Sequence, residues 1–385
     1  FIEEVGSGIP RLNYPLIEGE VSGCPSLLLE PSRRNLVQYS EDFSQSYWSK
    51  LNTSVSGNLI SPDGSANAFK LVENTSSGDH RIDAQGVSTS SGSKYTLSMF
   101  LKKDGDREWF KLRDFITNAY INVNLSNGTI GGTNLANSTQ NSEYYGNGWY
   151  RVSFTFTASS SVNLRLYIGV GDNDTNYQGN GSSGVLMYGT QVEQGSYPTS
   201  YIPTNGSQVT RSAGNLVNFA PDYWQNLGGI PYIDAYGNSS ADLYNGTEGV
   251  LFFEMKPSAL DGVKKIITLS SGYLDDRIIL GYNTNNTLIA SVYNNNAWQS
   301  VLGGQTEGID GFIKVALKYK NNDFSLFING EEVKTDASGL VYGADTLKIL
   351  RFSGVGRDSR FYGSIKQFMY FDVALNSTEL INLTK

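Results

Sequence analysis

Apolar and polar residues alternate along several short stretches of this chain, as they do in a β-strand with one buried face. The clearest stretches are 94–102, 119–125, 162–170 and 312–320. Asn329-Gly330 stands between DFSLFI and EEVK and predicts a two-residue hairpin, because a type I′ turn needs positive φ at both positions. Strand-like runs about ten residues apart favour antiparallel sandwiches over alternating strands and helices.

A short helix is expected in the tail, from Asn376 to Leu383. Asn376 is a good N-cap, and Glu379 follows three residues later, which is the spacing of a capping box. The rest of the pattern predicts an all-β protein with two antiparallel β-sandwich domains of the jelly-roll type. An extended N-terminal arm is expected to precede them.

The domain boundaries follow from where the alternation stops. We expect the arm over residues 1–34, the first sandwich over 35–211 and the second over 247–385. Between the sandwiches, residues 212–246 lose the alternation and gather Gly, Pro, Asn and aromatic residues, which indicates a linker. Each sandwich has a complete set of strands, so the sequence predicts that 247–385 folds alone.

The arm contains an apolar run, Leu27, Leu28 and Leu29, beside an otherwise extended segment. An unpaired edge strand is a site for β-augmentation by another chain. The run is therefore expected to dock onto a partner, so that deleting residues 1–31 would abolish assembly and leave both sandwiches folded. The alternative is that the run closes the first sandwich.

Composition narrows the classes of function. The 385 residues have a net charge of -8 and 17% charged residues, whereas nucleic-acid binding requires clustered Lys and Arg. The single cysteine, Cys24, allows no intrachain disulfide. No apolar stretch approaches the ~20 residues of a membrane span, and the first residues lack the profile of a signal peptide. The chain begins at Phe1, which is typical of a processed or trimmed product.

Three sequence segments, here called phrases, are more specific indicators of a family: CPSLLLEPSRRNLVQYSEDF (24–43), GNGWYRVSFTF (146–156) and GSYPTSYIPT (195–204). Their order and spacing resemble those of phage tail and fibre proteins and their prophage relatives. That resemblance implies a carbohydrate-binding-module-like jelly roll followed by a concanavalin A-like (laminin G-like) sandwich. The segment SIKQFMYFDVALNSTEL (364–380) is similar to the last strand and short helix of that concanavalin A-like sandwich.

The resemblance implies a non-enzymatic virion protein of the tail fibre, spike or head fibre type, made in the bacterial cytoplasm and placed on the virion surface. Host cell-surface polysaccharide and other virion proteins are the expected partners, with a homotrimer by analogy. A purely structural decoration or fibre subunit is the closest alternative. A polysaccharide-degrading enzyme is the third, because carboxylate pairs such as Asp104 with Asp106 or Asp275 with Asp276 occur in loops.

Sugar binding needs aromatic rings for the apolar faces of pyranoses and planar polar groups for their hydroxyls. The candidates are four aromatics and an arginine: Trp109, Arg113, Tyr120, Tyr177 and Trp298. For Trp109 a core position and a ligand contact are both open, whereas Trp48 and Trp149 are interpreted as core. His80, the single histidine, is expected in a polar loop as a surface or loop-anchoring imidazole.

No cofactor is expected apart from a possible structural calcium. Asp172 and Asp174 offer hard oxygen ligands in a loop, although the spacing does not match an EF-hand. The alternative for this loop is a turn stabilised by Asx side chains.

Overall fold

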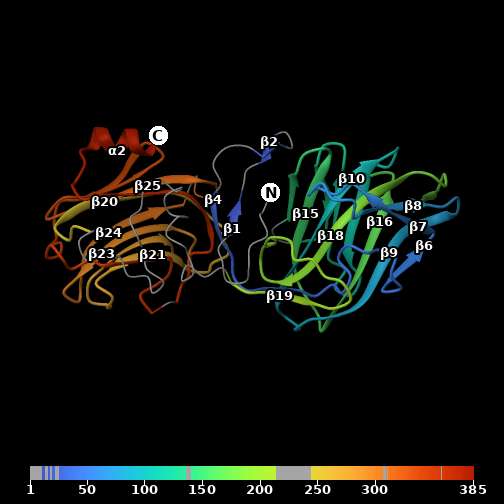
Figure 1. The fold of residues 1–385 in the computed structure, drawn as a ribbon, viewed down its shortest axis with the longest axis horizontal. Helices are drawn as coiled ribbons and strands as arrows, with labels where there is room; N and C mark the ends of the chain where they lie inside the picture. The colour runs from blue at the N-terminus through green and yellow to red at the C-terminus, as the bar shows by residue number, and fades with distance from the viewer. Residues whose placement is uncertain are drawn as a thin grey trace. The chain divides into compact units, whose positions relative to one another are not determined.

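The computed structural model describes residues 11–13, 16–17, 20–21, 26–135, 140–213, 244–306, 309, 311–356 and 358–385. Within this part the chain forms two compact units, as Figure 1 shows. The first unit is built on residues 32–212. The second combines the described residues from 244 onward with residues 26–31 and Arg11–Asn13. Nearly all regular structure is antiparallel β, so the predicted fold class is confirmed.

The first unit is a sandwich of two sheets (Figure 1). One sheet has the order β14 (Gln140–Tyr144), β15 (Trp149–Thr157), β10 (Lys94–Asp104), β18 (Gly184–Gln194), β8 (Ala68–Glu73) and β7 (Thr53–Leu59). The other has the order β13 (Ile130–Thr133), β12 (Tyr120–Asn124), β11 (Trp109–Asp114), β16 (Ser161–Gly169), β9 (Ser77–Ser88) and β17 (Asn176–Gln178), with β6 (Trp48–Leu51) also paired to β9. A short pair, β5 (Arg33–Asn35) and β19 (Val209–Arg211), completes the unit.

The core of the first unit lies between its two sheets, because the alternating apolar residues of both sheets point inward. Leu97 and Met99 of β10 belong to the same buried cluster as Phe110 and Leu112 of β11. Trp48 is in this cluster. Trp149 is also buried, in a smaller cluster with Phe100 and Tyr188. Both tryptophans are therefore core residues, as their sequence contexts predict.

The second unit is likewise a two-sheet sandwich. Its larger sheet has the order β1 (Arg11–Asn13), β4 (Ser26–Leu29), β29 (Gly363–Phe371), β20 (Glu248–Pro257), β25 (Ile313–Lys320), β26 (Phe324–Ile328) and β27 (Glu331–Asp336). The smaller sheet has the order β24 (Ala297–Gln305), β23 (Leu288–Asn294), β22 (Arg277–Tyr282), β21 (Lys265–Ser270) and β28 (Ile349–Arg351). The remaining described strands, β2 (Leu16–Ile17) and β3 (Glu20–Val21), pair with each other.

Two local predictions for the second unit are confirmed. Asn329 and Gly330 join β26 to β27 with φ values of 49° and 86°, as the predicted hairpin turn requires. Helix α2 (Ser377–Thr384) has Asn376 as N-cap and a complete capping box with Glu379. Leu380 of α2 is buried against Phe252 and Phe327, so the helix covers the outer side of the larger sheet.

The expected docking arm requires a correction. Strand β4 pairs with β29, with Leu27 opposite Ile365 and Leu29 opposite Gly363. Leu27 and Leu29 lie in the core of the second sandwich, and Leu28 is half-buried. Both edges of β4 are occupied, because β1 pairs on its other side. The apolar run is thus satisfied within its own chain and closes the second sandwich, not the first.

Most of the predicted linker, 214–243, and Cys24 lie outside the described residues. The described end of the linker belongs to the second sandwich, since Tyr244 is buried in its core. Among the described residues, no helix combines the length and apolar character needed to cross a membrane.

Candidate functional site

Strand β11 gathers three of the candidate residues on one side of the first sandwich. Phe110 and Leu112 point into the core, so Trp109, Lys111 and Arg113 point away from it and are half-buried. Across the ladder, Tyr120 of β12 lies opposite Arg113 on the same side. We call the outward surface formed by Trp109, Lys111, Arg113, Tyr120 and Arg165 the β11 face. Arg165 belongs to it because β16 places it opposite Arg113 on the other neighbouring strand.

A glycine makes room for Trp109 on this face. Gly169 of β16 lies directly opposite Trp109. A Cβ atom at Gly169 would lie 3.2 Å from the Cβ of Trp109 and 3.0 Å from the carbonyl oxygen of Asp174. A side chain at this position would therefore require the tryptophan or the following loop to shift by a few tenths of an ångström. Trp109 is neither core nor fully exposed, which is the arrangement required of an aromatic ring that can stack on a ligand.

The loop after β16 lies over one part of the β11 face. Both carboxylate oxygens of Asp172 accept from the backbone N–H of Gly132, at 2.8 and 2.9 Å. A Cβ atom at Gly131 would clash with this carboxylate, since it would lie 2.5 Å from Oδ1. Lys111 Nζ donates to Asn173 Oδ1 at 2.6 Å and lies 4.2 Å from the centre of the Tyr120 ring. Lys111, held by the loop, therefore covers one face of the Tyr120 ring, while Trp109 and Arg113 take no part in these contacts.

The same loop contains the expected calcium ligands. The described residues include no group of three or more His, Cys, Asp or Glu side chains that could hold a metal ion. Asp172 uses its oxygens on Gly132, and the backbone N–H of Asp174 donates to the Gly171 carbonyl in a tight turn. These contacts fix the loop within the protein, and the calcium site stays a prediction from the sequence.

We expect that removing divalent cations with EDTA leaves the melting temperature of the chain unchanged, because hydrogen bonds already fix this loop. Differential scanning calorimetry with and without added calcium is the measurement. A calcium-dependent rise in melting temperature that Asp172→Asn removes would instead establish a cation site.

Tyr177 differs from the other candidates of the first sandwich in its surroundings. Its hydroxyl donates to Glu73 Oε2 at 2.7 Å, and its ring stacks on His80 with centroids 4.6 Å apart. Arg107 forms a two-pronged pair with Glu73, at 2.7 and 2.6 Å, and lies 4.9 Å from the centre of the Tyr177 ring. The backbone N–H of Asn180 also donates to Glu73. Tyr177 is thus held in a network that joins β17 to β8 in the opposite sheet, and it is not part of the β11 face.

His80 also differs from its expected position. It lies in β9, not in a surface loop, and its side chain is fully buried. Neither ring nitrogen has a hydrogen-bond partner among the described residues. The stacking contact with Tyr177 therefore identifies His80 as a packing residue. The carboxylates considered for catalysis have local roles: Asp104 pairs with Lys70 at 2.6 Å, and Asp276 accepts from the backbone of Asn295.

Trp298, the fifth candidate, lies in the second unit at the hairpin of β23 and β24. The turn residues Asn295 and Asn296 both have positive φ. Trp298 is 52% exposed and packs edge-on against Tyr293, with centroids 4.8 Å apart. The Arg277 guanidinium lies 4.1 Å from the centre of the Tyr293 ring. Trp298 is therefore an exposed ring packed on Tyr293, and it belongs to a different unit from the other candidates.

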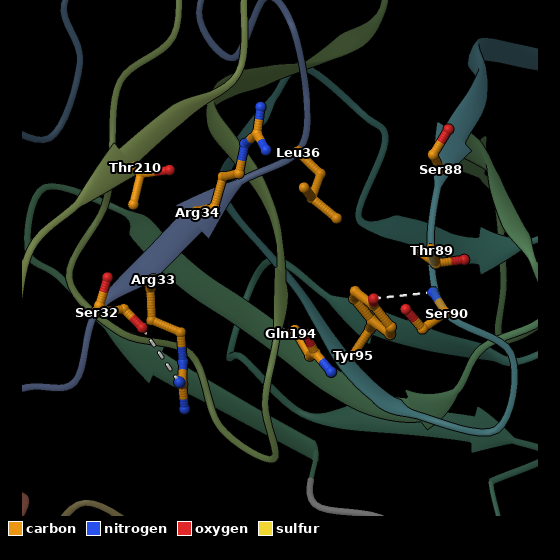
Figure 2. A pocket seen from close by; sticks show the side chains of 10 residues that line it. All are labelled: Ser32, Arg33, Arg34, Leu36, Ser88, Thr89, Ser90, Tyr95, Gln194 and Thr210. Carbon is orange, nitrogen blue, oxygen red and sulfur yellow. Dashed lines mark hydrogen bonds between the residues drawn. The ribbon is translucent and has the colours of Figure 1, made fainter.

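A separate pocket of about 520 Å³ opens where β5 and β19 meet the ends of the sheets of the first unit. Figure 2 shows Arg33 and Arg34 leaving β5 in opposite directions. Arg33 pairs with the buried carboxylate of Glu193 at 3.5 Å. Arg34 is exposed and forms no ion pair among the described residues. The other lining residues are mostly hydroxylated or amide-bearing: Ser32, Leu36, Ser88, Thr89, Ser90, Tyr95, Gln194 and Thr210.

Sequence reasoning missed three of the cations that the fold places at these surfaces, namely Lys111, Arg165 and Arg34. Lys111 could have been found, because it lies two residues from both Trp109 and Arg113 and therefore on the same side of the strand. Arg34 lies within the phrase 24–43, which also carries the resemblance. Arg165 could not have been found, because only the pairing of β11 with β16 brings it to Arg113.

The family comparison concerns the second unit. A family model described as the Concanavalin A-like lectin/glucanases superfamily matches residues 239–381. A search of the curated proteins gave no match.

Several solved structures resemble parts of the chain. The CBM40 module of the Ruminococcus gnavus IT-sialidase, bound to alpha2,3 sialyllactose, is 19% identical and has a TM-score of 0.31; the match covers 37% of this chain and 84% of that module. Domains LG4-5 of the mouse laminin alpha1 chain are 11% identical over 79% of this chain and 90% of theirs, with a TM-score of 0.29. A SAP-like pentraxin from Limulus polyphemus is 14% identical over 37% of this chain and 71% of its own, with a TM-score of 0.30. These likenesses carry no argument about a ligand. With the family match, the second unit is similar to concanavalin A-like and laminin G-like domains, as the sequence predicts.

Proposed function

We propose that the chain is a non-enzymatic adhesion protein that binds polysaccharide on the β11 face of its first sandwich. The observation that carries the proposal is that Trp109 and Arg113, both half-buried, lie on the same side of β11. Tyr120 of the neighbouring strand lies opposite Arg113. Trp109 and Arg113 are four residues apart, which corresponds to about 13 Å along a strand. An extended sugar chain could stack on the indole at one end and accept hydrogen bonds from the guanidinium at the other.

The place of the protein in the cell or particle is part of this proposal and rests on the sequence resemblance alone. The phrases at 24–43, 146–156 and 195–204 support a virion surface protein of a phage, of the tail fibre, spike or head fibre type. Its partners would then be the host surface polysaccharide and other virion proteins, in a trimeric assembly. The competing function, a decoration subunit that makes protein contacts only, predicts no glycan binding at all.

Replacing Trp109 with Ala should weaken polysaccharide binding by roughly 1 to 3 kcal/mol, because a partly exposed stacking contact is lost. The melting temperature should change little, since Trp109 is not in the core cluster. Glycan-array screening of the full chain identifies the ligand, and isothermal titration calorimetry of the wild type and the variant gives the affinities.

Tyr144→Ala is the matched control. Tyr144 is 50% exposed and lies on β14, in the other sheet of the same unit, so its loss should leave binding intact. Unchanged affinity in a well-folded Trp109→Ala protein would exclude the β11 face. Depolymerase assays on the bound polysaccharide separate adhesion from degradation, and shortening of the polymer would refute the non-enzymatic proposal.

A further inference from the structure

Two arginines lie side by side on the β11 face. Arg113 of β11 and Arg165 of β16 are directly opposite each other in the antiparallel ladder, and both side chains point away from the core. Lys111 lies two positions before Arg113 on the same side. Like charges directly opposite each other on adjacent strands destabilise a sheet. This row of three cations is therefore a cost to the fold unless something else uses it.

The protein itself offers little compensation. Among the described residues, none of Lys111, Arg113 and Arg165 forms an ion pair with a carboxylate. Asp83 of β9 lies opposite Arg165, on the side away from Arg113; burial raises the pKa of Asp83, and the charge of Arg165 acts to lower it. The hydrogen bonds of Asp83 come from Arg81, whose Nε donates to both of its oxygens at 3.1 and 3.0 Å. Arg113 Nε is buried and has no hydrogen-bond partner. Burial, and after it the charge of Arg113, lowers the pKa of Lys111, although the charges of Asp79 and Asp172 act to raise it.

An exposed ring positions the two guanidinium groups. Phe115, which is 42% exposed, lies just beyond the end of β11. The guanidinium carbon of Arg165 lies 3.4 Å from its ring centre, and that of Arg113 lies 5.1 Å from it. Both groups therefore gather at one ring. Arginine stacked in this way keeps its N–H donors available at its edges.

We propose that Arg113 and Arg165 form an oxyanion site, and that the polysaccharide bound along β11 is acidic. This inference rests on the proposed function and specifies its substrate class. A carboxylate or a sulfate group of the sugar chain would accept hydrogen bonds from both guanidinium groups and neutralise their repulsion. Trp109 would stack on a neighbouring sugar of the same chain.

The test uses the full-length chain and small probes at matched ionic strength. We expect sodium glucuronate, glucose 6-sulfate or both to raise the melting temperature, and glucose to have no effect. The two acidic probes separate a carboxylate site from a sulfate site. Arg113→Gln and Arg165→Gln should each weaken the affinity for the acidic probe, as derived from the shift in melting temperature, about tenfold or more, because each removes a charge-assisted pair. Both variants should remain folded, because each relieves a like-charge contact while it loses a contact with Phe115.

Arg34→Gln is the matched control, because it removes one exposed positive charge from the pocket of Figure 2 and none from the β11 face. It should respond to the acidic probes as the wild type does. The inference is overturned if glucose and the acidic probes act equally, if neither acidic probe acts, or if Arg34→Gln loses the response while Arg113→Gln keeps it.

The outcomes for the two proposals are distinguishable. Binding of neutral polysaccharides only, lost in Trp109→Ala, would leave the proposed function standing and refute the acidic class. A response to the acidic probes that Arg113→Gln removes, without binding of any polysaccharide, would establish the oxyanion site and refute the polysaccharide function.

Discussion

Removing residues 1–31 should unfold the second sandwich and leave the first one folded. Strand β4 supplies Leu27, 1% exposed, and Leu29, 4% exposed, to the core of the second unit. Its loss would open that core and leave the edge of β29 unpaired. Proteolysis and NMR of the truncated chain would show whether one set of β-sheet signals disappears. Two folded sandwiches in the truncated chain would contradict the role of β4 and restore the docking-arm hypothesis.

Single substitutions test the same strand more finely. Leu27→Ala should lower the free energy of unfolding of the second unit by about 2 to 5 kcal/mol, the usual cost of deleting a buried leucine side chain. Leu28→Ala is the matched control and should cost less, because Leu28 in the same strand is half-buried. Equal effects of the two substitutions would show that the alternation of β4 does not direct Leu27 into the core. Chemical denaturation followed by tryptophan fluorescence gives both values.

A fragment from 244 to 385 should consequently be unstable by itself, contrary to the expectation from strand counting. A synthetic peptide of residues 24–31 should rescue it by adding the missing strand, as in β-augmentation. A fragment with the same melting temperature whether or not the peptide is present would show that β4 is dispensable.

Arg107→Ala should destabilise the first unit by about 3 to 5 kcal/mol, because it leaves the charge of Glu73 without its cationic partner. The Glu73 side chain is fully buried, and its pair with Arg107 is two-pronged. Lys70→Ala is the control: its pair with Asp104 is partly exposed and should contribute less than about 1 kcal/mol. Urea denaturation of the two variants gives the comparison. Similar small losses in both would mean that Tyr177 and Asn180 satisfy Glu73 without the arginine.

The same carboxylate gives a pH dependence of defined sign. Burial acts to raise the pKa of Glu73, but hydrogen bonds from Arg107, the Asn180 backbone and Tyr177 outweigh it and hold the pKa below its usual value. The ionised carboxylate therefore stabilises the folded state above the unfolded-chain pKa of about 4.3. This contribution is lost as the pH falls through the lower, folded-state pKa. The stability difference between the wild type and Glu73→Gln should shrink over this acidic range, and a constant difference would contradict the assignment.

The sequence by itself determined the features that depend on neighbours along the chain. Alternation predicted strands such as β10 and β25, and Asn329-Gly330 predicted the hairpin because only certain residues adopt positive φ at low cost. The capping box at Asn376 is likewise a local arrangement. Trp109 and Arg113 are four residues apart, so any strand through them has both on one side, but the sequence leaves open which side faces the core.

Only the tertiary structure decided which distant segments meet. Arg165 reaches Arg113 through a strand pairing, and Tyr177 reaches Glu73 across 104 residues, which separates it from the β11 face. The partner of the leucine run in β4 was decided in the same way. An apolar alternating strand can complete any sheet with a free edge, and its periodicity does not specify which one. In this chain the edge that buries Leu27 and Leu29 belongs to β29, more than three hundred residues away, because there both leucines enter a core and β4 is paired along both of its edges.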